Sequence, residues 1–157
     1  MIALVLQVAR AKQIPMAARV RLQRRLRRAM RAAGVGHCEL SLTLTDDGSI
    51  RALNCDYRHV DRPTDVLSFS MREGEGGDLH PELLGDIVIS VETATRQAHA
   101  AHRTIEEELL QLAVHGLAHL CGYDHATLDE ERRMFGWEEK LRIEALCQRA
   151  VHSVPRP

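Results

Sequence analysis

Three histidines in the segment HGLAHLCGYDH have spacings that suit a metal site: His115, His119 and His125. On a helix, residues four apart lie on one face, so His115 and His119 can direct their imidazoles at one ion. Gly122 can adopt the left-handed conformation that ends a helix, and the chain can then fold back so that His125 becomes a third ligand. Three imidazoles leave one tetrahedral position open, as in catalytic zinc sites. The spacing therefore predicts one zinc ion per chain.

The residue after the first histidine is Gly116, and this glycine limits the chemistry of such a site. In zinc proteases with an HExxH helix, a glutamate at that position takes a proton from water and passes it to the leaving amine. Phosphodiester cleavage depends instead on in-line geometry, a polarising cation and neutralisation of charge on the phosphate oxygens. An arginine near the metal supplies that neutralisation well. The pattern favours phosphodiester chemistry over peptide hydrolysis.

Hydrophobic periodicity predicts the elements that must position these residues. We expect strands at residues 2–8, 38–45, 66–69 and 84–90, and helices at residues 15–33, 49–57, 91–101, 104–121 and 128–150. The first strand is mostly apolar and is expected to be buried on both faces. Asp46–Gly48 is predicted to be a turn that closes the second strand, and residues 71–82 an exposed loop.

This order of strands and helices predicts an α+β fold. We expect a single small domain over residues 1–157, with a mixed sheet of about four strands covered by helices and the metal site on a central helix. Composition is ordinary for a globular protein, with 45% hydrophobic and 27% charged residues. Only 3% of residues are aromatic, so a nucleic acid would be bound mainly by charge.

Two features bear on location and redox chemistry. The N-terminal MIALVLQVAR is too short for a spanning helix and lacks the basic region of a signal peptide, which favours a cytoplasmic protein without membrane contact. The four cysteines are widely spaced, so neither a cysteine zinc site nor a redox motif is indicated. Cys121 is expected to face away from the ion because it lies about 200° around the helix from His119.

Residues 10–31 hold nine basic side chains and no acidic one. Leu22, Leu26, Ala29 and Ala33 recur at helical spacing and are expected to face inward, with the arginines outside. Such a face suits a polyanion such as rRNA, or a protein partner, and the sequence leaves both open.

Three segments resemble the YbeY family of bacterial zinc-dependent endoribonucleases. HGLAHLCGYDH is similar to the family signature HGxLHLxGYDH, NCDYRHVDRPTDVLSF to its second conserved segment and LGDIVIS to a third. The resemblance implies a single-strand-specific endoribonuclease that acts on rRNA and ribosomal particles in 16S rRNA 3′-end maturation and ribosome quality control. It also implies His115, His119 and His125 as zinc ligands, and Arg58 as the cleft residue that binds the scissile phosphate.

The sequence departs from the family pattern at three positions. Ala118 replaces a usual leucine and should only thin the contacts behind the metal helix. His59 replaces a usual glycine, so either the backbone tolerates a side chain there or another imidazole approaches the cleft. Ser70 replaces a common proline, which predicts a less rigid loop beyond it.

The mechanism that follows has zinc activating a water or polarising a phosphoryl oxygen while Arg58 stabilises the added charge. The general base is open. Asp124 and Glu108 are candidates for it, but Asp124 is expected instead to orient a ligand through a hydrogen bond, and Glu108 to be a surface carboxylate. Two other functions remain: a metallopeptidase, favoured only by the histidine spacing, and a ribosome assembly factor whose zinc is structural. The oligomeric state is also left open.

Overall fold

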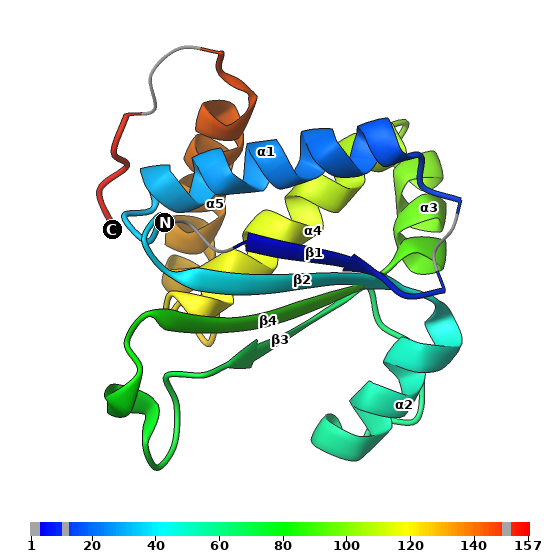
Figure 1. Ribbon diagram of the computed structural model, residues 1–157, viewed down its shortest axis with the longest axis horizontal. Coiled ribbons are helices and arrows are strands. Elements are labelled where there is room, and N and C mark those ends of the chain that lie inside the picture. Colours follow the sequence, from blue (N-terminus) through cyan, green and yellow to red (C-terminus); the bar gives the residue numbers. More distant parts are fainter. Residues whose placement is uncertain (1–3, 11–12, 149–151) are drawn as a thin grey trace.

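The computed structural model describes residues 4–10, 13–148 and 152–157, and it has an α+β fold (Figure 1). The strands are β1 (Leu4–Val8), β2 (Glu39–Thr45), β3 (Val66–Ser70) and β4 (Leu83–Ser90). The helices are α1 (Met16–Ala32), α2 (Asp47–Arg58), α3 (Val91–Ala100), α4 (Ile105–Leu120) and α5 (Leu128–Leu146), and Gly77–Leu79 form a short 3-10 turn.

The strands form one mixed sheet in the order β1-β2-β4-β3. β1, β2 and β4 run parallel, and β3 pairs antiparallel with β4 at one edge. Helices α1, α4 and α5 lie together over one face, whereas α2 lies on the opposite side (Figure 1). Under α2, a small apolar cluster joins Ile50 to Leu67 and Val88. The predicted fold class is therefore confirmed.

Helix α4 is the central helix of this arrangement. It contacts β3 and β4 on the sheet and both α1 and α5 in the helical layer, and most of its side chains are buried. It begins with a capping box in which the Thr104 hydroxyl accepts from the Glu107 amide and the Glu107 carboxylate accepts from the Thr104 amide. A helix fixed on all sides is a rigid support for a metal site at its C-terminal end.

Two sequence-based expectations about local structure are wrong. Among the described strands β1 is an edge strand that pairs with β2 alone, and its burial alternates, with Val5 46% exposed, because α2 covers the other face of the sheet at β3 and β4 and not at β1. Asp46–Gly48 is not a turn of the kind expected: the Asp46 side chain accepts from the Ser49 amide and caps α2, which begins at Asp47. The last helix ends at Leu146, before the expected residue 150; the expected positions 2, 3, 149 and 150 lie outside the described residues.

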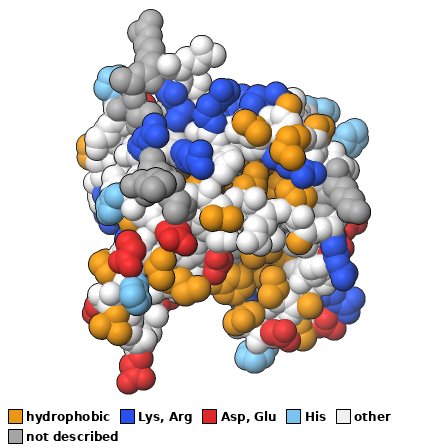
Figure 2. Space-filling model, viewed as in Figure 1, with side chains coloured by type: hydrophobic (Ala, Val, Ile, Leu, Met, Phe, Trp, Pro, Cys, Tyr) orange, Lys and Arg blue, Asp and Glu red, His pale blue; other side chains and the backbone are white. Residues whose placement is uncertain are grey.

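The basic helix α1 turns its apolar stripe inward as expected, since Leu22, Leu26 and Ala29 are buried. Basic side chains gather over α1 in Figure 2, but some of this charge is neutralised. Glu106, in the first turn of α4, pairs with Arg21 at 2.6 Å and with Arg25 at 3.6 Å. In the part of the chain that the structure describes, no helix is both long and apolar enough to span a bilayer.

Candidate metal centre and its cleft

The three predicted ligands come together at the end of α4. His115, His119 and His125 each offer a ring nitrogen, and these atoms lie within 4.8 Å of one another. The Nε2 atoms of His115 and His119 are 3.1 Å apart. His115 and His119 are partly buried, whereas His125 follows the helix and is exposed. The structure thus places all three imidazoles where one ion could meet them.

Hydrogen bonds at the far side of two rings fix which nitrogen is free. His115 Nδ1 lies 2.8 Å from Oε1 of Glu138, and His119 Nδ1 lies 3.0 Å from the carbonyl oxygen of Tyr123. Both partners are acceptors, so each neutral ring carries its hydrogen on Nδ1 and leaves a lone pair on Nε2. Carboxylate and carbonyl partners of this kind typically orient zinc-bound histidines.

The two Nε2 atoms therefore face each other as acceptors, and a shared cation is what would relieve their repulsion. Zn–N bonds of about 2.05 Å at a tetrahedral angle separate two ligand nitrogens by about 3.3 Å. The observed 3.1 Å is close to that separation. The donor set, its spacing and its tautomers all fit a divalent metal that favours imidazole.

The surroundings shift the pKa values of His115 and His119 in opposite directions. The hydrogen bond to Glu138 raises the pKa of His115, whereas burial lowers the pKa of His119. A lowered pKa keeps His119 neutral, which is the form that binds a metal. At His115 a proton is held more strongly and competes with the ion.

Gly122 produces the reversal that brings His125 back to the helix end. Its φ is 91°, its amide donates to the His119 carbonyl at 2.9 Å, and the Tyr123 amide donates to the Ala118 carbonyl at 3.1 Å. This pair of bonds ends the helix in a Schellman motif, as predicted. The Tyr123 ring then packs against Trp137 of α5, with ring centroids 4.7 Å apart. That contact holds the turn after α4 against α5, next to Glu138.

Gly116 lies where α4 touches the sheet. A Cβ atom at this position would be 2.9 Å from Cγ2 of Ile87 and 3.0 Å from Oγ of Ser68. Both distances are shorter than ordinary van der Waals contact, so a larger side chain would require the Ile87 and Ser68 side chains to shift. The position that carries the base in zinc proteases is therefore filled by the sheet itself.

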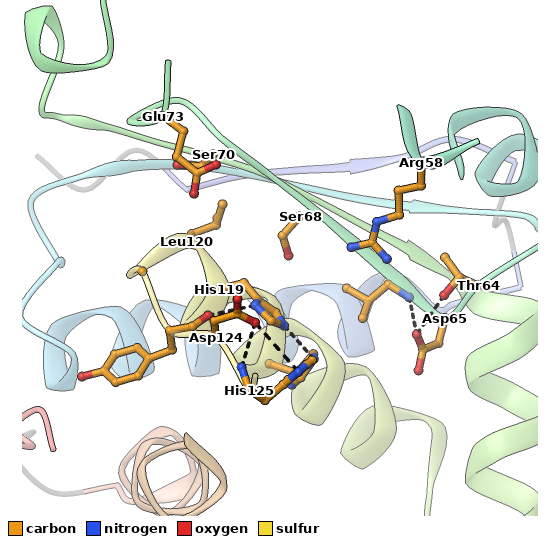
Figure 3. Close-up of a pocket in the computed structure, with 14 residues that line it drawn as sticks. Arg58, Thr64, Asp65, Ser68, Ser70, Glu73, His119, Leu120, Asp124 and His125 are labelled. Atoms are coloured by element: carbon orange, nitrogen blue, oxygen red, sulfur yellow. Dashed lines mark hydrogen bonds and ion pairs between the residues drawn. The ribbon is translucent and has the colours of Figure 1, made fainter. Parts of the chain in front are cut away.

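The histidines open into a cleft of about 570 Å³ that Arg58 also lines. Its wall is formed by β3, with Ser68 and Ser70 facing the cleft, and Arg58 reaches in from the end of α2 (Figure 3). Among the described residues, Arg58 has no hydrogen-bond or ion-pair partner, and it is exposed. A free guanidinium and three imidazoles thus share one cleft.

The expectations about Glu108, Asp124 and Cys121 have different outcomes in the structure. Glu108 is not a surface carboxylate: it is 2% exposed and pairs with Arg103 at 2.8 Å, because the turn before α4 folds over it. Asp124 orients the backbone of its neighbour, accepting from the His125 amide at 2.8 Å, while its carboxylate lies 4.0 Å from the His125 ring. Cys121 does not line the cleft, as expected.

The departures from the family pattern also have structural outcomes. His59 adopts a φ of 59° at the C-cap of α2, so the backbone there keeps the left-handed conformation with a side chain present. His59 does not line the cleft, whereas Ser70 does. Ala118 is a fully buried residue of α4.

Glu138 is the residue of this site that the sequence did not predict. It lies 23 positions after His115 in a helix rich in charged residues. No local spacing rule links the two, since their contact depends on how α5 packs against α4. The only signal in the sequence was that metal-bound histidines usually have a carboxylate or carbonyl partner.

Comparison with known proteins places the chain in a family. The model of the family described as Endoribonuclease YbeY matches residues 7–145. A relative from Heliobacterium modesticaldum, named Endoribonuclease YbeY, is 50% identical over 111 residues, which cover 66% of this chain and 67% of the relative. A relative of the same name from Geobacter metallireducens is 42% identical over 123 residues, covering 77% and 82%.

A solved structure supports the fold independently. The solution structure of a Thermotoga maritima protein matches with a TM-score of 0.58 and 24% identity, covering 90% of this chain and 88% of that one. With the match of the family model over most of the chain, these comparisons lead to one conclusion. The chain belongs to the Endoribonuclease YbeY family, whose name denotes hydrolases that act on RNA.

Proposed function

We propose that this chain is a single-strand-specific, zinc-dependent endoribonuclease that acts in 16S rRNA 3′-end maturation and ribosome quality control in the cytoplasm. One zinc ion would be held by His115, His119 and His125, and residues 1–157 would work as one domain. The observation that carries the proposal is the shared cleft, where three imidazoles at ligand distance face an arginine side chain that has no partner among the described residues. Its physiological substrates would be rRNA and ribosomal particles.

A zinc ion bound here would supply a Lewis acid beside the scissile phosphate. The chain's own residues then do the remaining work. Arg58 binds the phosphate through its planar guanidinium and stabilises the charge that develops on the non-bridging oxygens. Glu138 and the Tyr123 carbonyl hold two ligand rings in the required tautomers. Gly122 keeps His125 at the open side of the site.

A metallopeptidase is a weaker alternative because of the contacts around Gly116. Ile87 and Ser68 occupy the space that a side chain at this position would need. The peptidase base is absent at this position and could not be restored unless the Ile87 and Ser68 side chains shifted. Cleavage of peptides but not RNA by the zinc-loaded protein would establish this alternative.

An assembly factor with a purely structural zinc is the other alternative. A structural zinc site is usually closed by four protein ligands, whereas this one has three, and its third histidine is exposed at the cleft. Replacement of His119 by alanine separates the two functions. A catalytic site should leave a folded but inactive protein, and a structural site should leave an unfolded one.

The test is an assay of the purified chain on single-stranded and duplex RNA of the same sequence, with zinc and with a chelator. We expect cleavage of the single strand alone, and only with the metal. Equal cleavage of both substrates would contradict the proposed specificity.

A further inference from the structure

A side pocket continues the cleft past Arg58. It has a volume of about 480 Å³ and shares three lining residues, Arg58, Thr64 and Asp65, with the cleft. Arg62 and Pro63 line it from the segment after α2, and α3 contributes Thr93 and Gln97. The two hollows are therefore neighbours that meet at these three residues.

The side pocket has a positive charge at Arg62 that no acidic side chain among the described residues neutralises. Arg62 is exposed, and its guanidinium has no hydrogen bond or ion pair with any residue that the structure describes. The adjacent acid, Asp61, is already held by Arg51 through two bonds of 2.8 and 3.1 Å. Asp65, which faces both hollows, accepts from the Val66 amide at 2.7 Å and from the Gln97 side chain at 3.2 Å.

The other end of the cleft has the opposite charge. β3 runs along the cleft wall from Val66 to Ser70, a length of about 13 Å at about 3.3 Å per residue. Beyond Ser70 stands the exposed carboxylate of Glu73 (Figure 3). Asp124 adds a second exposed carboxylate to the lining, beside His125 and away from that end. A polyanion in the cleft is attracted toward the Arg58 end and repelled from the Glu73 end.

We propose that the side pocket is a phosphate subsite for the RNA strand, in which Arg62 binds the backbone of a nucleotide next to the scissile phosphate. The strand then leaves the cleft toward α3 and not past Glu73. The inference rests on the proposed function, because it identifies how that substrate extends from the same cleft. The ligand chemistry is a phosphodiester backbone, and contacts to a backbone do not select a base sequence.

Salt-dependent binding tests the subsite directly. The probe is a fluorescent single-stranded RNA of about twelve nucleotides, measured by anisotropy with a chelator present so that no cleavage occurs. Removing one arginine that neutralises a phosphate should reduce the slope of log affinity against log salt by about 0.7. We expect Arg62→Ala to reduce the slope by this amount and to weaken binding about three- to tenfold at low salt.

Three variants make the result specific. Arg62→Lys keeps the charge and should retain most of the slope. Arg133→Ala is the matched control, because Arg133 is also exposed and lines neither hollow; it should leave the slope unchanged. Glu73→Gln removes the repelling carboxylate and should strengthen binding.

A folded Arg62→Ala protein with the slope and affinity of the parent would overturn the subsite. Equal reductions in Arg62→Ala and Arg133→Ala would overturn it as well, because the effect would then be general surface charge. A parent protein that binds this RNA but does not cut it when loaded with zinc contradicts the proposed function alone. The two failures are therefore distinguishable.

Discussion

His115 on the central helix lies 2.8 Å from Glu138 on the last helix, measured from Nδ1 to Oε1. The Glu138 side chain is only 12% exposed, so the bond is sheltered from solvent. Through it, the contact between α4 and α5 sets the ring orientation of a metal ligand. The affinity of the site should therefore depend on a residue that never touches the ion.

Glu138→Ala tests this dependence. Loss of the carboxylate frees the His115 ring and its tautomer, and such partners typically change metal affinity about 10- to 100-fold. We expect zinc binding, measured by competition with a chromophoric chelator, to weaken within that range. Glu139→Ala is the control, since Glu139 is the exposed neighbour on the same helix. Equal affinities for the two variants would show that the bond does not position the ring.

Gly116→Ala tests the close contact between α4 and the sheet. The new methyl group would lie 2.9 Å from Ile87, and overpacking of this kind costs about 1–3 kcal/mol in the free energy of unfolding. Gly136 is the matched control, because a Cβ atom there meets nothing within 4 Å. Gly136→Ala should instead stabilise α5 by about 0.5–1 kcal/mol. Chemical denaturation of the metal-free proteins measures both, and a Gly116→Ala protein stabilised as much as Gly136→Ala would contradict the contact.

The ion pair between Arg21 and Glu106 should make the free energy of unfolding sensitive to acid. The hydrogen bond from Arg21 holds the pKa of the Glu106 carboxyl below its ordinary value. A depressed pKa stabilises the folded state above the ordinary pKa of a glutamate, and this contribution is lost as pH falls through the folded pKa. Because the pair is partly exposed, the effect should be modest.

The comparison for this prediction is Glu106→Gln, which has no carboxyl to protonate. The free energy of unfolding of the parent should fall more steeply than that of the variant below about pH 4.5. Measurements at several pH values in urea would check the difference. Parallel curves for the two proteins would mean that the Arg21 pair adds nothing in solution.

Local spacing predicted that His115, His119 and His125 come together, because helix periodicity and a left-handed glycine act within eleven positions of the chain. Contacts between elements far apart in the sequence could not be predicted from local spacing. Glu138 and the burial of Glu108 depend on how helices pack, and the exposure of β1 depends on strand order. Arg58 was assigned from the family resemblance and not from spacing, since nothing local ties the end of α2 to α4.

Arg58→Ala tests the role of the arginine apart from the metal. Arg58 lines the cleft but has no partner within the described residues, so its removal should leave the fold and zinc affinity unchanged. Loss of one donor that stabilises developing charge typically slows the chemical step about 100- to 1000-fold. Single-turnover cleavage of single-stranded RNA measures that effect. Full activity in the zinc-loaded variant would remove Arg58 from the mechanism.

The central claim is that one metal ion on His115, His119 and His125 makes this cleft a ribonuclease. The most direct measurement is the rate of single-stranded RNA cleavage while zinc is added back to chelator-treated protein. The account predicts a rate that rises from background and levels off at one zinc ion per chain, with no such rise in His119→Ala. Cleavage by the parent that is indifferent to zinc, or an equal response in His119→Ala, would contradict it.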